Sequence, residues 1–543
     1  MESCVRNHIW VLNGVICDVL SSKKHTPVDI QIFDYKQCFD SLWLQECMND
    51  VYQGGIQDDK FALLYDVNKY VNVSVKTPVG KTKRGIITNA IIQGDVFGPK
   101  LCGKQVDEIG KECLEGDKYT YKYKGKVNIP PLSMLDDLLC ISECGHKTAM
   151  AHSYIKLKTA CKKLQFGPQK CKKIHIGKTK EDFKCQPLFV DNWKENTVEE
   201  CETGTIRIED VCEGEDVMEE KQEEKYLGDV ISQDGRNIKN IQARVNKGTG
   251  IVRKILTILD GIPFGKYHYE AGVILRNSLL VSSMLFNSEV WYNITKSELE
   301  LLETVDLMLL RGILKAPKST PKEMLFLELG LVPFREIVRK RRLGFLHYIL
   351  NESKDSMIHK VFESQRENKT SKDWVTTVLK DLKEINLELS FEQIGKMKKG
   401  LFMNTIKRKT DHKALLYLEK LKEKHSKVRF LKHPVLRIQK YLMPNETNMK
   451  KEHCEQIFKI RSRVTQAKVN FKNKYETYEC EIAEETQEHI LQCEKILKNH
   501  KESEPNENIE YEKVMNGNVK EQLTIAKLFM KNMEIIEKIR KNK

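Results

Sequence analysis

The sequence predicts an α+β protein in which most strands come before most helices. Two observations support this fold class. In the first part of the chain, short segments alternate apolar and polar residues and are rich in β-branched and aromatic types, as strands are. From about residue 236 onward, apolar residues recur at spacings of three and four, which is the helical period.

The expected elements follow in chain order. Residues 28–34 (VDIQIFD) are expected to form a strand that ends in a carboxylate, and a helix follows up to Gly54-Gly55. A second strand, 70–76, turns at 77–80, and residues 119–128 alternate Tyr and Lys like a hairpin arm. The other expected helices lie at about 5–20, 241–260, 267–290, 296–315, 321–350, 372–385 and 519–541.

Composition excludes a membrane protein and a wholly disordered one. The 543 residues are 31% charged and 40% hydrophobic, with room for roughly three or four domains. The 91 Lys and Arg exceed the 77 Asp and Glu by 14, which suggests an anionic partner. The 16 cysteines are scattered and no secretory signal opens the chain, so an intracellular protein, nuclear or cytoplasmic and with reduced thiols, is expected.

The charge is unevenly distributed. Residues 1–150 are close to neutral, whereas residues 199–224 carry 12 acidic and 2 basic side chains. The excess positive charge therefore lies in the second half of the chain.

Two adjacent acids, Asp136 and Asp137, interrupt the apolar run LSMLDDLLCIS (132–142). Carboxylates in such surroundings must be paired, protonated or bound to metal, and no basic residue lies within several positions. Nucleotidyl transfer by two divalent ions requires carboxylates from separate elements, and Asp34 at the end of its strand is a second source. A turn or hairpin tip explains each of these acids equally simply, so both interpretations remain open on these residues alone.

Five segments in a fixed order resemble a known family. They are FDYKQCFDSL (33–42), IIQGDVFGPKLC (91–102), SMLDDLLC (133–140), LQFGPQKCKKIHIGK (164–178) and KYLGDVIS (225–232). Together they resemble the successive palm motifs of non-LTR retrotransposon (LINE-type) reverse transcriptases, over about residues 1–350. The resemblance implies a right-hand polymerase palm of antiparallel strands and helices, followed by a mostly α-helical thumb and C-terminal region.

The resemblance also implies roles for individual residues. Asp34 and Asp136 would hold two Mg²⁺ ions, with Asp137 as a less direct neighbour, and Lys170 would protonate the leaving pyrophosphate. Phe39 would be the aromatic gate that rejects a ribose 2′-OH. Gln93, Gly94 and Pro99 would belong to the segment that packs against the template and the incoming nucleotide.

Several positions depart from the family pattern. Met134-Leu135 replace the usual aromatic and small residues before the paired acids, and Gly98 stands where Ser is usual. Asp34 also comes early, which implies an N-terminally truncated chain with only a remnant of the fingers and no endonuclease.

The helical half carries a basic cluster that is expected to contact a nucleic-acid backbone. Its residues are Arg335, Arg339, Lys340, Arg341 and Arg342. In the family this region closes on the template-primer duplex, and an RNA–DNA hybrid is held through its phosphates and A-form shape. A solvated basic helix face without a ligand is the alternative.

A C-terminal segment resembles the Cys-Cys-His-Cys zinc motif of these proteins. Cys480, His489 and Cys493 match three ligands, whereas Thr477 stands where the first Cys would fall. A structural Zn²⁺ takes four ligands, so either the site is incomplete or Cys454 or His453 completes it. The alternative is a helix at 484–497 with His489 and Cys493 on one partly buried face.

The expected function is RNA-directed DNA polymerase, with an RNA template, a DNA primer and dNTPs as partners. The alternatives are an inactive relic that only binds RNA or hybrid, and a cellular binding protein derived from such an element. The expected divisions are a palm with finger remnant at 1–182, an acidic inter-motif segment at 183–235, a thumb at 236–350, a helical region at 351–460, a degraded zinc-knuckle-like segment at 461–500 and a charged tail at 501–543.

Overall fold

The chain divides into two compact units in the computed structural model. One comprises Met1–Asn240, Val290–Asn293 and Tyr348–Val378, and the other Ile241–Glu289, Ile294–His347 and Leu379–Lys543. Residues 348–378 thus belong to the first unit, although the chain has already entered the second. The structure describes residues 5–21, 26–36, 38–87, 91, 96–115, 120–162, 164–177, 187–200, 206–265, 267–292, 294–370, 372–424, 435–443, 449–465, 467, 486–493, 496 and 512–541.

A five-stranded sheet with the order β13–β10–β1–β9–β8 forms the centre of the first unit. β1 (Val28–Asp34) lies between β9 (Asp137–Glu143) and β10 (Lys172–Ile176) and is antiparallel to both. β8 (Leu132–Met134) is antiparallel to β9, and β13 (Glu219–Glu220) is parallel to β10. The strand predicted at 28–34 is therefore confirmed, and it is central in the sheet.

Two helices connect these strands. α5 (Gly98–Glu115) precedes β8, and α6 (His146–Cys161) joins β9 to β10. The chain order β1–α5–β8–β9–α6–β10, with the spatial order β10–β1–β9–β8, is the split βαβ or ferredoxin-like arrangement. The predicted α+β class is confirmed.

Both faces of the central strands are buried. On one face, Phe33 of β1 and Leu138 and Cys140 of β9 pack with Ala151 and Ile155 of α6. On the opposite face, Ile30 of β1 lies beside its register partners Ile174 and Ile141. Helix α1 (Val5–Ser21) contacts β10. This two-sided burial explains why β1 is apolar along most of its length.

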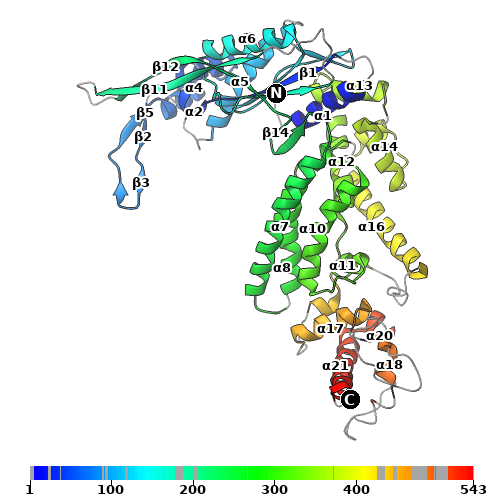
Figure 1. Ribbon diagram of the computed structural model, residues 1–543. Coiled ribbons are helices and arrows are strands. Elements are labelled where there is room, and N and C mark those ends of the chain that lie inside the picture. Colours follow the sequence, from blue (N-terminus) through cyan, green and yellow to red (C-terminus); the bar gives the residue numbers. More distant parts are fainter. Residues whose placement is uncertain are drawn as a thin grey trace. The chain divides into compact units, whose positions relative to one another are not determined.

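The other strands form separate hairpins, of which β11 and β12 make a long ribbon (Figure 1). The hairpin predicted at 119–128 is present as β6 and β7, whereas the strand predicted at 70–76 is split in two. These strands are β2 (Val71–Val73), β3 (Lys76–Thr77), β4 (Gly80–Lys81), β5 (Gly85–Ile87), β6 (Tyr121–Tyr123), β7 (Val127–Ile129), β11 (Phe189–Glu200), β12 (Ile206–Val217), β14 (Glu223–Tyr226) and β15 (Asp229–Ser232).

Helices make up the remaining elements. In the second unit, α7 (Ile238–Gly261), α8 (His268–Leu275) and α10 (Lys296–Leu314) pack closely, because Gly312 of α10 meets the Leu256 side chain and Gly272 of α8 meets Ile313 (Figure 1). The remaining helices are α2 (Cys38–Ser41), α3 (Leu44–Gln53), α4 (Asp58–Lys69), the π-helical η1 (Arg276–Val281), α9 (Ser282–Met284), η2 (Ser288–Val290), α11 (Lys322–Glu328), α12 (Phe334–Leu350), α13 (Met357–Glu367), α14 (Trp374–Glu384), α15 (Phe391–Lys396), α16 (Lys399–Lys424), η3 (Lys440–Leu442), α17 (Lys451–Arg461), α18 (Gln487–Gln492), α20 (Glu512–Asn516) and α21 (Val519–Lys541).

The helix predicted over 321–350 is interrupted. The interruption contains Gly330, whose φ is +64°, and Pro333, which precedes α12. A Cβ at Gly330 would clash with the backbone of Arg437, so this position requires glycine both for its conformation and for its close backbone contact. The single predicted helix is therefore two, α11 and α12.

A buried ion pair anchors α10. Arg276 donates from Nε to Asp306 Oδ1 at 2.7 Å and from Nη2 to Asp306 Oδ2 at 2.6 Å, and both side chains are fully enclosed. Nη2 also donates to the carbonyl of Val332 at 3.2 Å. A bidentate pair of this kind satisfies charges that would otherwise be costly to bury.

Among the described residues, no helix is both long enough and apolar enough to cross a membrane.

Replacing Asp306 by alanine should therefore destabilise the second unit. The buried Arg276 guanidinium would lose its counter-ion, which costs about 3–5 kcal/mol. Glu300→Ala, at an exposed position of the same helix, is the matched control and should change stability by less than about 0.5 kcal/mol. Denaturant unfolding checks both values, and equal losses for the two variants would contradict a structural role for the pair.

Candidate active site

Asp34 and Asp137 lie opposite each other at one end of the central sheet. Their Cα atoms are partners in the antiparallel β1–β9 register, so both side chains point to the same face. Residues in such a pair have Cβ atoms about 4.5–5.5 Å apart. The strand pairing alone thus brings together two carboxylates that are far apart in the sequence.

Asp136 adds a third carboxylate from the tight turn between β8 and β9. Met134, at the end of β8, pairs with Asp137, which leaves Leu135 and Asp136 as the turn residues. Leu135 has φ +59°, in the left-handed region that a leucine rarely adopts. The two adjacent acids therefore sit at a hairpin tip, as the simpler interpretation of the sequence holds, and the tip lies at the end of β1.

Lys170 reaches this cluster from the loop between α6 and β10. The backbone N–H of Gly167 donates to the carbonyl of Asp34 at 2.9 Å, and the N–H of Lys170 donates to the carbonyl of Gly167 at 2.9 Å. The Lys170 Nζ then donates to Asp34 Oδ1 at 3.0 Å, with 68% of its side chain exposed. The loop therefore holds an ammonium group beside the carboxylates and open to solvent.

The pKa values of the cluster reflect its crowding. Partial burial, followed by the charges of Asp136 and Asp34, raises the pKa of Asp137 to about 6, and Lys170 acts in the opposite direction. The hydrogen bond to Asp34 raises the pKa of Lys170. One lysine thus faces three acids, an arrangement that a divalent cation would relieve.

The donor set fits magnesium. Carboxylate oxygens are the protein ligands that Mg²⁺ prefers, and Asp34 and Asp136 come from separate elements as two-ion sites require. Within the described residues, the three carboxylates do not converge within 4.8 Å of one another. Two ions about 3.5–4 Å apart do not need all three acids at one point.

The predicted nucleotide-contacting residues are only partly described. Phe39 lies on α2, half-buried against the core, and the N–H of Ile91 donates to its carbonyl at 3.1 Å. Pro99 is the second residue of α5 and is exposed, a position where proline is well tolerated. Gln93 and Gly94 lie outside the described residues.

A contact between two buried cysteines joins α2, which carries Phe39, to α5. The Sγ atoms of Cys38 and Cys102 are 3.3 Å apart, and both thiols are buried. This contact sets the position of Phe39, the residue that follows Cys38, relative to α5.

Two further residues near the acids have no role in the sequence-based prediction. The N–H of Gly167 donates to the carbonyl of Asp34. Gly167 precedes a proline, and this Gly-Pro pair is the sequence signal that could have predicted a turn there. Tyr226 of β14 is buried, and its pKa is raised by burial and by the nearby charge of Asp137. The fifth motif, KYLGDVIS, thus forms the β14–β15 hairpin close to the acids.

The basic cluster on α12 differs from its predicted arrangement. Arg339 is buried and forms ion pairs with Glu336, Asp381 and Glu384, and Arg342 is buried against Asp381 at 2.6 Å. Both guanidinium groups join α12 to α14 and have carboxylate partners in place of phosphates. The acids on α14 lie 39 to 45 residues away in the sequence, whereas Glu336 lies on α12 itself. The predicted contact of Arg339 and Arg342 with a nucleic-acid backbone stays a prediction.

Two of the other three members of the cluster also form hydrogen bonds within the protein. Arg335 makes a bidentate pair with Glu303, at 2.7 and 2.5 Å, and Arg341 donates to the carbonyl of Leu285. Lys340 is exposed. With 36% of its side chain exposed, Arg335 also faces solvent in part, and the five predicted backbone contacts stay predictions.

The predicted zinc ligands are described in part. His489 lies in α18 and Cys493 follows that helix, buried in an apolar cluster, whereas Cys480 lies outside the described residues. The Nε2 atom of His489 is buried and makes no hydrogen bond within the described part of the chain. An imidazole nitrogen in this state suits a metal ligand, and the zinc site stays a prediction.

The chain has a likeness among solved structures but none among family models or curated proteins. No protein-family model and no curated protein matches the chain. Among solved structures, it is similar to telomerase from Candida albicans in complex with a TWJ fragment of telomeric RNA, with 12% sequence identity and a TM-score of 0.31. The match covers 59% of this chain and 52% of that one.

The pKa of Asp137 predicts a pH-dependent stability. Because its pKa is higher in the folded than in the unfolded chain, the folded state binds more protons, and stability falls as pH rises from about 4 through about 6. Asp137→Asn should remove this loss and stabilise the metal-free chain at pH 7.5 by about 1–2 kcal/mol, allowing for solvent screening. Thermal unfolding across this pH range, with Asp59→Asn as an exposed control, checks the effect. An unchanged pH profile in Asp137→Asn would contradict it.

Proposed function

We propose that this chain is an RNA-directed DNA polymerase of the non-LTR retrotransposon type, which extends a primer 3′-OH by two-metal nucleotidyl transfer. The observation that carries this proposal is the placement of Asp34, Asp136 and Asp137. Three carboxylates lie near one another at one end of the β1–β9 pair, where like charges destabilise the fold unless cations compensate for them. Sequence motifs typical of the family supply all three acids and Lys170.

In this proposal, Asp34 and Asp136 hold the two Mg²⁺ ions, and Asp137 adds negative charge that favours their binding. Bound Mg²⁺ supplies Lewis acidity, which lowers the pKa of the primer hydroxyl and neutralises charge on the phosphates. Lys170 is solvent-exposed and its pKa is raised, so its ammonium group is protonated at neutral pH. It is the group available to donate a proton to the departing pyrophosphate.

The partners follow from the same resemblance: an RNA template, a DNA primer and dNTPs. The three acids are only partly buried and Lys170 beside them is exposed, so the cluster is open to solvent, as a site for long polymeric substrates requires. The antiparallel strands β10, β1, β9 and β8, together with α5 and α6, have the arrangement that a polymerase palm implies. A polymerase palm is therefore part of the proposed function.

Asp136→Asn should reduce primer extension on an RNA template by at least about 100-fold, because a neutral amide is a poor ligand for Mg²⁺. Binding of an RNA–DNA hybrid should stay within about threefold of the unsubstituted chain, since the substitution preserves shape and removes a negative charge. Asp59→Asn, at an exposed position of α4, is the matched control and should retain full activity.

The same assay separates the alternatives. An inactive relic would bind the hybrid but would not extend the primer in any variant. Extension by Asp136→Asn at the rate of the unsubstituted chain would contradict the two-metal assignment.

Phe39→Val should increase incorporation of ribonucleotides relative to deoxyribonucleotides by about 10-fold or more, because the smaller side chain leaves space for a 2′-OH. Extension with dNTPs should persist, since Phe39 is only half-buried and truncating it leaves the core largely intact. Competing rNTP and dNTP incorporation on one template measures the ratio. An unchanged ratio would remove Phe39 from the proposed gate.

A further inference from the structure

A second group of metal-ligating side chains lies at the other end of β1. Asp29, Cys144 and His175 come from β1, from the residue after β9 and from β10, and none of them has a role in the proposed polymerase site. Asp29 is separated from Asp34 by five residues of extended strand, or about 17 Å. The two groups are therefore distinct sites.

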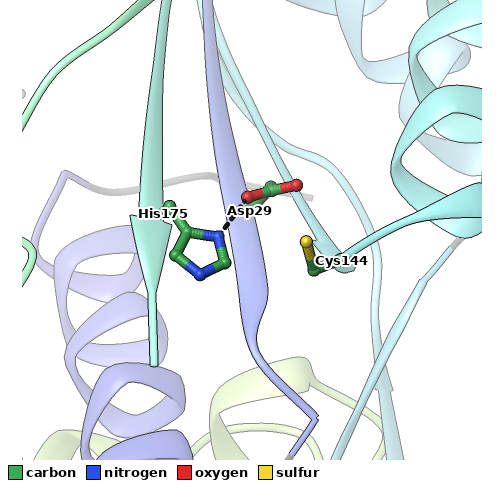
Figure 2. A group of neighbouring side chains, drawn as sticks. All are labelled: Asp29, Cys144 and His175. Carbon is green, nitrogen blue, oxygen red and sulfur yellow. Dashed lines mark hydrogen bonds and ion pairs between the residues drawn. The ribbon is translucent and has the colours of Figure 1, made fainter. Parts of the chain in front are cut away.

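Strand register brings these three residues together. Asp29 is the direct register partner of His175 and of Ser142, and the N–H of Cys144 donates to the carbonyl of Pro27 at 2.8 Å. Figure 2 shows the Asp29 carboxylate between the imidazole of His175 and the thiol of Cys144. His175 Nδ1 is 2.8 Å from Asp29 Oδ1.

All three side chains are buried, with exposed fractions of 1% for Asp29, 4% for Cys144 and 4% for His175. Burial of a carboxylate requires a charge or hydrogen-bond partner, and the aspartate has His175. A thiol, an imidazole and a carboxylate enclosed together are also the set of donors that binds zinc. Asp29 thus has a hydrogen-bond partner and lies beside two other side chains that can bind a metal ion.

The geometry fits a single transition-metal ion. One ligand atom from each residue lies within 4.8 Å of the other two, so a point exists within about 2.8 Å of all three. Zn²⁺ binds nitrogen, oxygen and sulfur at about 2.0–2.3 Å. Movements of about half an ångström, within reach of side-chain rotation, would bring the three atoms to bonding distance.

The charges also favour a divalent ion. A thiolate and a carboxylate together carry two negative charges, which one Zn²⁺ neutralises, so the enclosed group becomes neutral overall. On binding, the thiol proton of Cys144 goes to solvent, and the imidazole nitrogen of His175 that binds the ion carries no proton. The sulfur and nitrogen donors favour Zn²⁺ over Mg²⁺, which prefers oxygen ligands.

We propose that Asp29, Cys144 and His175, with a water molecule as the fourth ligand, form a zinc site that joins β1, β9 and β10 at the end of the sheet distant from the candidate active site. Such a site would stabilise the register that places Asp34 opposite Asp137. It does not depend on polymerase activity, and its test uses metal binding only.

The test is Co²⁺ titration of the full chain, with the thiolate-to-cobalt charge-transfer band as the readout. The unsubstituted chain should bind one more thiolate-ligated equivalent than Cys144→Ser does, and binding should release about one proton per ion. Cys140→Ser, at another buried cysteine of the same strand, is the matched control and should keep that equivalent. Any zinc at the C-terminal cysteines would contribute equally to all three chains.

Folding of each variant is checked by circular dichroism. Should Cys144→Ser fail to fold, Asp29→Asn, which preserves side-chain shape, replaces it and should lower cobalt affinity by at least about 10-fold. Absence of a cobalt–thiolate band in the folded unsubstituted chain would overturn the proposal. An equal number of equivalents in the unsubstituted chain and folded Cys144→Ser would overturn it as well.

Discussion

The antiparallel register between β1 and β9 is the constraint on which the candidate site depends. It places Asp34 directly opposite Asp137, and the short turn to β8 adds Asp136 at the same end. A shift of one residue would turn Asp137 to the opposite face and separate the acids. The buried faces of β1 fix this register, since Phe33 and Leu138 pack on α6 while the isoleucines fill the other side. The apolar core thus determines where the charges meet.

Repulsion among these acids is the cost of that arrangement. Lys170 offsets part of it through the loop that Gly167 ties to Asp34, yet the pKa of Asp137 still rises to about 6. Strain of this kind, held in place by a rigid sheet, is common at functional sites. In the proposed mechanism, bound cations relieve the repulsion among the acids. The repulsion that destabilises the metal-free chain therefore favours metal binding.

Much of the site could be predicted from the sequence because its signals are local. The strand ending in Asp34, the acids inside an apolar run and the Tyr-Lys hairpin each follow from a pattern within about ten residues. The arginines of α12 could not be assigned in this way. Arg339 and Arg342 pair with Asp381 of α14, and only tertiary packing reveals that these charges point inward. The trio of Asp29, Cys144 and His175 was missed for the same reason, since its members are separated by more than 100 and by about 30 residues.

The most direct test of the two-metal account is an anomalous difference map of the chain crystallised with Mn²⁺, an RNA template, a DNA primer and a dNTP. The account predicts manganese bound to the carboxylates of Asp34 and Asp136, beside the primer terminus. Manganese elsewhere in the map, with the primer terminus distant from these two acids, would contradict it.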